Sequence, residues 1–230
     1  MPDGPDIDTY CKSKTLAEDE AWKIARGEGE YASDGKASFE LATIHPGLVS
    51  GPVLGNIGKF TSMDILLRIL NGNSMVDGGF PSIDVRDVAR AHVLAMVTPS
   101  AAGHRFITTH SSMPLIETQK ALADEFNGKG YSVSTSLTPT FLINCLACCS
   151  RDVATAQSLI GKFPKLDSSS TTSILGLRFY DQAQSFVDMG HSAIQHGYVE
   201  DKSKDKELSK MQPALHAPFV EGLMIKGKSS

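Results

Sequence analysis

The sequence predicts an α/β fold with a parallel sheet. Over the first half of the chain, short apolar segments typical of buried strands alternate with helix-forming segments, which is the pattern of βαβ units. Glycine or proline residues stand at most of the expected boundaries. The 230 residues, 41% of them hydrophobic, suffice for a sizeable core without disulfides or metal ions.

Local signals predict each element of the first half. Helix formers from residue 9 to residue 26 end at Gly27 and Gly29, which can adopt a left-handed cap. An apolar run over 39–44, closed by Pro46-Gly47, predicts a strand. Further along, we expect a helix over 63–70, a strand over 83–85, a helix over 88–97 capped by Asp87, and a strand over 105–108.

After residue 110 the pattern becomes mostly helical. Pro114 suits the first position of a helix over 115–126. We expect largely apolar helices within 140–161, a polar loop over 168–173, and a helix over 181–196 that ends at Gly197.

Composition and charge exclude several kinds of partner. A net charge of −4 gives no general attraction to nucleic acid or to an anionic membrane surface. The longest apolar stretch, within 141–149, is far shorter than the roughly 20 residues of a membrane-spanning helix. His191 and His196 are five residues apart and fall on different faces of a helix, so we expect no metal site. The N-terminus has no secretory signal and the chain has four cysteines, which predicts a cytoplasmic protein.

Tyr10 and Lys14 form the one constellation with evident chemistry. They are four residues apart in a predicted helix, so their side chains share one face. An ammonium group beside a phenol stabilises the phenolate, which makes the phenol a better acid and base near neutral pH. Such a tyrosine can give a proton to a carbonyl oxygen or take it back.

The chain also carries an ordered series of motifs. They are Tyr10–Lys14 with Ala17-Glu18 and Ala21-Trp22, a strand over 41–44 with His45–Val49 and Gly51-Pro52, Ile83–His92, and Ile174–Leu177 with the helix that ends at Gly197. In this order they resemble the extended short-chain dehydrogenase/reductase family of the NAD-dependent epimerase/dehydratase superfamily. The resemblance covers roughly residues 5 to 200 and is strongest to the dihydroflavonol reductase-like and aldehyde/ketone reductase-like branch.

The resemblance implies an oxidoreductase that reduces an aldehyde or ketone, such as a dihydroflavonol, with NADP, or alternatively NAD, as cofactor. It implies that Tyr10 is the catalytic acid/base, that Lys14 assists it, and that both bind the cofactor, Lys14 through the nicotinamide ribose. The cofactor-binding loop would comprise Pro46, Gly47, Leu48 and Val49, and Ser62 would reach a cofactor phosphate. Asp87 would be structural. The partners implied are a small carbonyl substrate and, by family analogy, a second copy in a homodimer.

The family's glycine-rich turn, G-x-G-x-x-G, is absent from the sequence. We therefore expect the C-terminal half of a Rossmann-type, doubly wound parallel sheet with a smaller, mostly helical substrate domain. The expected organisation is a second half of the dinucleotide-binding domain over 1–110, a substrate-binding region over 111–200, and a charged, disordered tail over 201–230. Two alternatives remain open: an NAD-dependent sugar epimerase or dehydratase, and a catalytically silent fragment that acts as a binding module.

Overall fold

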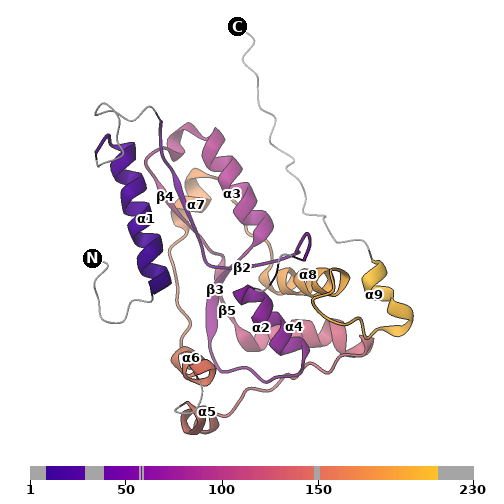
Figure 1. The fold of residues 1–230 in the computed structure, drawn as a ribbon. Helices are drawn as coiled ribbons and strands as arrows, with labels where there is room; N and C mark the ends of the chain where they lie inside the picture. Colours follow the sequence, from indigo (N-terminus) through magenta and orange to yellow (C-terminus); the bar gives the residue numbers. More distant parts are fainter. Residues whose placement is uncertain (1–8, 29–38, 57, 59, 148–150, 212–230) are drawn as a thin grey trace. The chain divides into compact units, whose positions relative to one another are not determined.

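The structure, a computed structural model, describes residues 9–28, 39–56, 58, 60–147 and 151–211 (Figure 1). The chain divides into two compact units whose segments interleave along the sequence. The first contains the residues up to Pro46, Ala89–Thr108 and Asp167–Arg178, and the second contains Gly47–Val88, Thr109–Leu166 and the residues from Phe179 onward. The sequence predicts consecutive ranges, 1–110 and 111–200, whereas each of these units contains segments from both.

The first unit is built on a pair of parallel strands. β1 (Thr43–Pro46) pairs with β4 (Arg105–Thr108) from Thr43 opposite Arg105 to Pro46 opposite Thr108. Its helical segments are α1 (Thr9–Ala25), most of α3 (Val85–Val97), η1 (Pro99–Ala101) and α7 (Ser169–Ile174). The hydroxyl of Thr171 donates to the carbonyl of Ile107 at 2.7 Å and so attaches α7 to β4.

The second unit combines a three-stranded sheet with most of the helices. Its strands lie in the order β2 (Leu48–Ser50), β3 (Gly79–Asp84) and β5 (Ser111–Pro114), with β2 parallel and β5 antiparallel to β3. The helical segments are α2 (Thr61–Leu70), α4 (Leu115–Phe126), η2 (Asn127–Lys129), α5 (Thr140–Leu146), α6 (Arg151–Leu159), α8 (Gln182–Gln195), η3 (Lys204–Lys206) and α9 (Glu207–Lys210).

The main hydrophobic core lies where α2, α4 and α8 pack together. Leu66 of α2 and Leu122 and Phe126 of α4 are fully buried in it. Gly190 of α8 makes the close packing possible, because a Cβ at this position would lie 2.7 Å from a ring carbon of Phe126. The apolar periodicity that predicts these helices therefore corresponds to one shared core.

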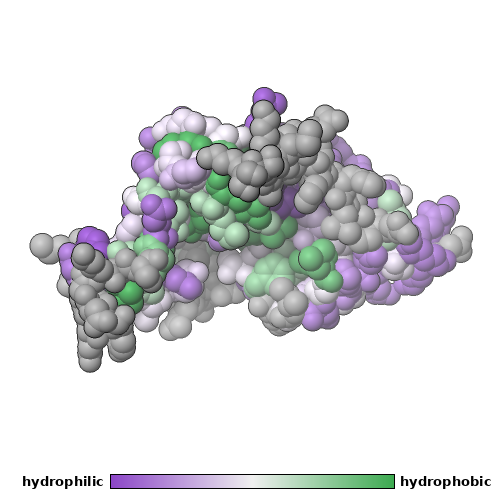
Figure 2. Space-filling view, turned by 90° about the horizontal axis from the view of Figure 1, so that it is seen from above, coloured by the Kyte–Doolittle hydropathy of each residue, from purple (hydrophilic) through white to green (hydrophobic). Residues whose placement is uncertain are grey.

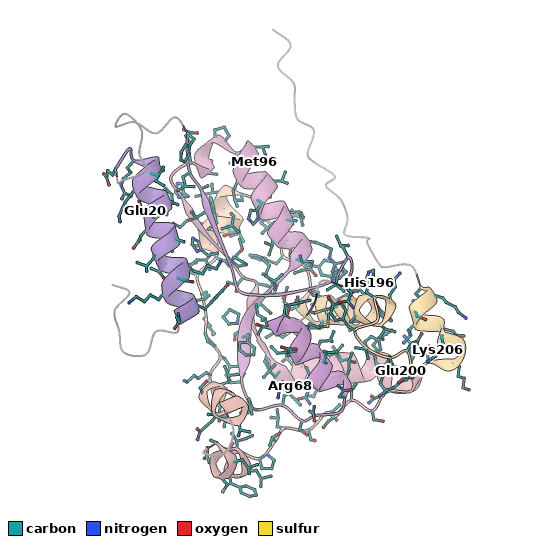
Figure 3. The ribbon with its side chains drawn as sticks, viewed as in Figure 1. Glu20, Arg68, Met96, His196, Glu200 and Lys206 are labelled. Carbon is teal, nitrogen blue, oxygen red and sulfur yellow. The ribbon has the colours of Figure 1, made fainter. Side chains whose placement is uncertain are left out.

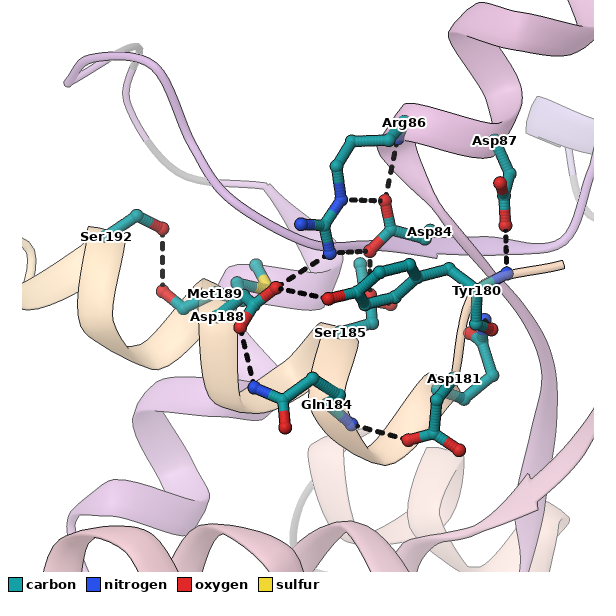
Figure 4. Close-up of polar contacts among 12 residues, drawn as sticks. Asp84, Arg86, Asp87, Tyr180, Asp181, Gln184, Ser185, Asp188, Met189 and Ser192 are labelled. Atoms are coloured by element: carbon teal, nitrogen blue, oxygen red, sulfur yellow. Dashed lines mark hydrogen bonds and ion pairs between the residues drawn. The ribbon is translucent and has the colours of Figure 1, made fainter. Parts of the chain in front are cut away.

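A buried network of charges connects the sheet of the second unit to α8 (Figure 4). Arg86 donates to both carboxylate oxygens of Asp84, at 2.8 and 2.7 Å, and to Asp188 at 2.8 Å. The guanidinium also lies over the ring of Tyr180, 3.9 Å from its centroid. Burial opposes the charge on Arg86, but the hydrogen bonds to Asp84 and Asp188 prevail and raise its pKa.

Most of the predicted helices and strands are confirmed, with shifts at several boundaries, and two of the three strand pairs among the described residues are parallel. The strand expected over 39–44 is Thr43–Pro46, because its pairing with β4 begins at Thr43. The strand expected over 83–85 begins earlier, at Gly79. The helix expected over 88–97 begins at Val85, so Asp87 lies in its first turn rather than at its N-cap. Asp87 instead accepts the backbone N–H of Tyr180 at 2.6 Å.

Two expected irregular segments are helical. The prediction of a polar loop over 168–173 is wrong, since α7 occupies most of this segment. The prediction of a disordered tail from residue 201 is wrong for the first part of that segment, where Leu208 of α9 is buried in the main core. Asp201 holds this segment by accepting the backbone N–H groups of Ser203 and Ser209 at 2.9 and 2.7 Å. The rest of that predicted tail, 212–230, lies outside the described residues.

The end of the second unit that carries α9 is strongly polar on its surface. It lies at the right in Figure 1 and in Figure 3, which labels Glu200 and Lys206, and it is mostly hydrophilic in Figure 2. Among the helices that the structure describes, none has both the length and the apolar character needed to cross a membrane.

Candidate active site

Tyr10 and Lys14 lie together on the first half of α1. The ammonium nitrogen of Lys14 is 5.5 Å from the centroid of the Tyr10 ring, as expected for side chains one helical turn apart. Tyr10 is 66% exposed, and Lys14 is exposed as well. The pair is therefore preformed, and its polar groups are accessible to a ligand.

Glu18, one turn beyond Lys14, attaches α1 to the parallel strands of the first unit. Its carboxylate accepts two hydrogen bonds from Arg105 of β4, at 2.6 and 2.9 Å. On β1, the hydroxyl of Thr43 donates to the same carboxylate at 3.2 Å, and Nε2 of His45 lies 3.1 Å from it. The helix that carries Tyr10 and Lys14 is thus tied to both strands through one side chain.

The surroundings of Glu18 favour its ionised form. The hydrogen bond from Arg105 is the main cause, and together with the contribution of Trp22 and the charge of His45 it lowers the pKa of Glu18 to about 2, against the opposing effect of burial. The same hydrogen bond raises the pKa of Arg105. The pair is therefore fully charged at neutral pH.

Sequence reasoning identified Glu18 only as part of a motif and did not find Arg105. Tyr10, Lys14 and Glu18 follow one another at intervals of four, and this spacing places Glu18 on the same helical face. Arg105 lies 87 residues away from Glu18. No local pattern predicts that partner, because the contact depends on the pairing of β1 with β4.

The predicted loop 46–49 joins the end of β1 to β2. Gly47 is required there by close packing, since a Cβ at this position would lie 2.3 Å from the carbonyl oxygen of Pro81. The side chain of Leu48 packs against the main core. Among the described strands, β2 pairs with β3 alone, so it is an edge strand with backbone groups on its other side.

Ser62 lies in the first turn of α2 and is 5% exposed. It belongs to the second unit, together with residues 47–49, whereas Tyr10, Lys14 and Pro46 belong to the first. The structure thus brings together Tyr10 with Lys14, and Gly47 with Leu48 and Val49. Within the described part of the chain, no group of three or more histidine, cysteine or acidic side chains is arranged to hold a metal ion.

Comparisons with known proteins show which proteins the chain resembles. The chain is 31% identical over 210 residues to a putative uncharacterized oxidoreductase of Saccharomyces cerevisiae, an alignment that covers 86% of this chain and 52% of the yeast protein. It is 30% identical over 192 residues to a putative NADPH-dependent methylglyoxal reductase of Candida albicans, covering 78% of this chain and 48% of that protein. These relatives are oxidoreductases and reductases, and the chain is similar to the extended short-chain dehydrogenase/reductase family.

A solved member of this family has the same fold. The NADPH complex of a Candida albicans protein named Gre2 matches with a TM-score of 0.58 and 25% identity, over 81% of this chain and 51% of that one. The Rossmann-type α/β fold is thus confirmed. The chain spans about half the length of the curated relatives that it matches. No family model matches it.

Proposed function

We propose that this chain supplies the proton-transferring half of an NADPH-dependent carbonyl reductase. The observation that carries the proposal is the placement of Tyr10 and Lys14 on one exposed face of α1. The relatives' printed activities support it: one is named as an NADPH-dependent methylglyoxal reductase, and another was solved with NADPH.

Each unit carries groups of the kind that the nicotinamide end of the cofactor requires. Lys14 offers an exposed ammonium group for the ribose hydroxyls, and the outer edge of β2 offers backbone groups for the carboxamide. Pro46, Gly47, Leu48 and Val49 are proposed to form that contact. Ser62 is assigned to a phosphate, where the first turn of α2 adds backbone N–H groups that have no acceptor within the helix.

The reaction requires a hydride and a proton. NADPH, when bound, supplies the hydride to the carbonyl carbon. Tyr10 donates its phenolic proton to the carbonyl oxygen, and Lys14 stabilises the resulting phenolate. Glu18 takes part in neither the hydride transfer nor the proton transfer. Its hydrogen bonds with Arg105 hold the helix that carries Tyr10 and Lys14. A cytoplasmic location and a homodimer stay predictions.

This sequence contains no glycine-rich turn of the kind that binds the pyrophosphate end of the cofactor. We therefore propose testing the chain both alone and fused behind the N-terminal half of the Candida albicans methylglyoxal reductase relative. Titration of NADPH, followed by its fluorescence, is expected to show much weaker binding to the isolated chain than to the fusion. Equal, micromolar binding by both would show that the front half is dispensable.

The fusion is then assayed for NADPH-dependent reduction of methylglyoxal and of larger aldehydes and ketones. Lys14→Met is expected to lower kcat/KM at least tenfold, whereas Lys12→Met, on the same exposed part of α1, changes it little. If neither the fusion nor its controls reduce any carbonyl compound while NADPH still binds, the chain is a binding module and the proposed function is wrong.

A further inference from the structure

A groove of about 470 Å³ lies between α4, α8 and α9 in the second unit. All three helices contribute to its apolar wall, which consists of Ala121, Ala183, Val187, Leu208 and Met211. The volume equals that of about 15 water molecules at about 30 Å³ each. The groove therefore has room for a few side chains of an extended polypeptide segment.

The groove also carries an excess of negative charge. Its titratable lining groups are four carboxylates and one histidine, namely Asp124, Glu125, Asp181, Asp188 and His191. Two of these carboxylates already have a cationic partner. Asp188 is paired with Arg86 at 2.8 Å, and Glu125 is paired with Lys129.

Asp124 and Asp181 carry the charge that is left. Both side chains are exposed, and within the described residues neither makes an ion pair. Asp181 caps α8 by accepting the N–H of Gln184 at 2.8 Å, a contact that leaves the negative charge in place (Figure 4). A segment that fits this groove should therefore bring cationic side chains together with apolar ones.

The chain itself continues from the wall of this groove. Met211, the last described residue, lines the groove and is 49% exposed. The sequence beyond it contains the segment Leu223–Lys228, which reads Leu-Met-Ile-Lys-Gly-Lys. Alternate residues of an extended segment share one side, so Met224, Lys226 and Lys228 would project in the same direction. This side of the segment matches the groove in both apolarity and charge.

The connection to this segment is long enough to reach every part of the groove. The 15 residues 212–226 can span up to about 50 Å at about 3.3 Å each. The 14 residues of α8, by comparison, extend over about 21 Å at 1.5 Å each. Tethering also holds the segment near the groove at an effective concentration of millimolar order, which favours it over a free partner.

We propose that residues 223–228 of this chain bind in the groove between α4, α8 and α9. The apolar side chains of the segment pack against the apolar wall, and its two lysines lie beside Asp124 and Asp181. The contact covers the exposed part of Met211. It uses neither α1 nor the loop 46–49, so it does not depend on the proposed function.

Cross-linking of the full 230-residue chain with a carbodiimide, which joins an amine to a carboxylate without a spacer, tests the contact. Mass spectrometry of the cross-linked monomer is expected to identify Lys226 or Lys228 joined to Asp124 or Asp181. A mixture of isotope-labelled and unlabelled chains shows whether the bond forms within one chain. Cross-links that join only labelled to unlabelled chains would assign the groove to the segment of a second copy and overturn the proposal, as would no cross-link from either lysine to the groove.

The rate of trypsin cleavage after Lys226 gives a second measure, because a bound segment is protected from the protease. The double variant Asp124→Asn/Asp181→Asn is expected to be cleaved there at least threefold faster than wild type, and asparagine at 181 still caps α8. Glu117→Gln/Glu207→Gln removes the same charge at exposed positions of α4 and α9 that do not line the groove, and it should leave the rate unchanged. Circular dichroism establishes that both variants are folded. Equal rates in wild type and the two variants would overturn the proposal.

Discussion

Ser50 and Ser185 share a hydrogen bond, with their hydroxyl oxygens 2.8 Å apart, although 135 residues separate them in the sequence. Ser185 donates its single proton to Asp84 at 2.6 Å, so Ser50 is the donor to Ser185. Two turns further along α8, the hydroxyl of Ser192 accepts the backbone N–H of Val53 at 2.9 Å. One face of α8 thus holds the segment that follows β2 and the proposed nicotinamide loop.

Replacing Ser185 with alanine is expected to destabilise the protein by about 1–3 kcal/mol, because it removes one of the donors to the buried Asp84 carboxylate. Urea unfolding followed by circular dichroism measures the effect. Ser132→Ala makes the same chemical change at an exposed position and is expected to cost less than about 0.5 kcal/mol. Equal losses in the two variants would show that the Ser185 bonds contribute nothing.

Removing Arg86 is expected to have a larger effect. Arg86→Met leaves the carboxylates of Asp84 and Asp188 buried without their shared cation, which costs about 3–5 kcal/mol. Arg26→Met removes an exposed ion pair with Glu28 and should cost no more than about 1 kcal/mol. Thermal unfolding of the two variants makes the comparison, and a stable Arg86→Met protein would contradict a structural role for the network.

Glu18 should make part of the protein's stability depend on pH. Its pKa in the folded protein is about 2, below its ordinary value of 4.5, so its contribution is fully present above about pH 4.5 and is lost as the pH falls toward 2. The difference in unfolding free energy between wild type and Glu18→Gln should therefore shrink over this range. Glu20→Gln, which removes an exposed pair with Lys23, should show little pH-dependent difference. A difference in unfolding free energy between wild type and Glu18→Gln that stays constant from pH 7 to pH 2.5 would contradict the lowered pKa of Glu18.

Gly47→Ala tests whether the loop between β1 and β2 depends on close backbone packing. The added Cβ would lie 2.3 Å from the carbonyl oxygen of Pro81, and the shift needed to relieve this contact is expected to cost about 1–3 kcal/mol. Gly55→Ala is the control, because a Cβ there would meet nothing within 4 Å and its φ is not positive. Chemical denaturation of both variants checks the prediction, and unchanged stability of Gly47→Ala would refute it.

Local patterns predicted the helices well because these elements carry their own signals. The apolar spacing of α2 and the cap of α8, where Asp181 accepts the N–H of Gln184 at 2.8 Å, are both visible in the sequence. α7 was missed because serine and threonine have low helix propensity, and the contact that holds it, from Thr171 to Ile107, is distant in sequence. β3 is longer than the predicted strand and includes Pro81, a residue type that is uncommon within strands because it cannot donate a backbone hydrogen bond.

In the candidate site, too, the sequence predicts what a local pattern determines and misses what depends on contacts between distant segments. Tyr10 and Lys14 were predictable because an interval of four residues places two side chains on one helical face. The attachment of their helix through Glu18 and Arg105, and the packing of Gly47 against Pro81, depend on strand pairing that no local pattern specifies. The groove between α4, α8 and α9 likewise arises from segments that are far apart in the sequence.

The measurement that tests the central claim most directly is the rate of NADPH-dependent carbonyl reduction by the fusion protein with Tyr10→Phe. This change removes one hydroxyl from a side chain that is 66% exposed, so folding should be unaffected. Loss of a positioned general acid lowers turnover by about 10²–10⁴-fold. We predict a fall in kcat of that order with NADPH affinity retained; turnover equal to that of the unmodified fusion would contradict the account.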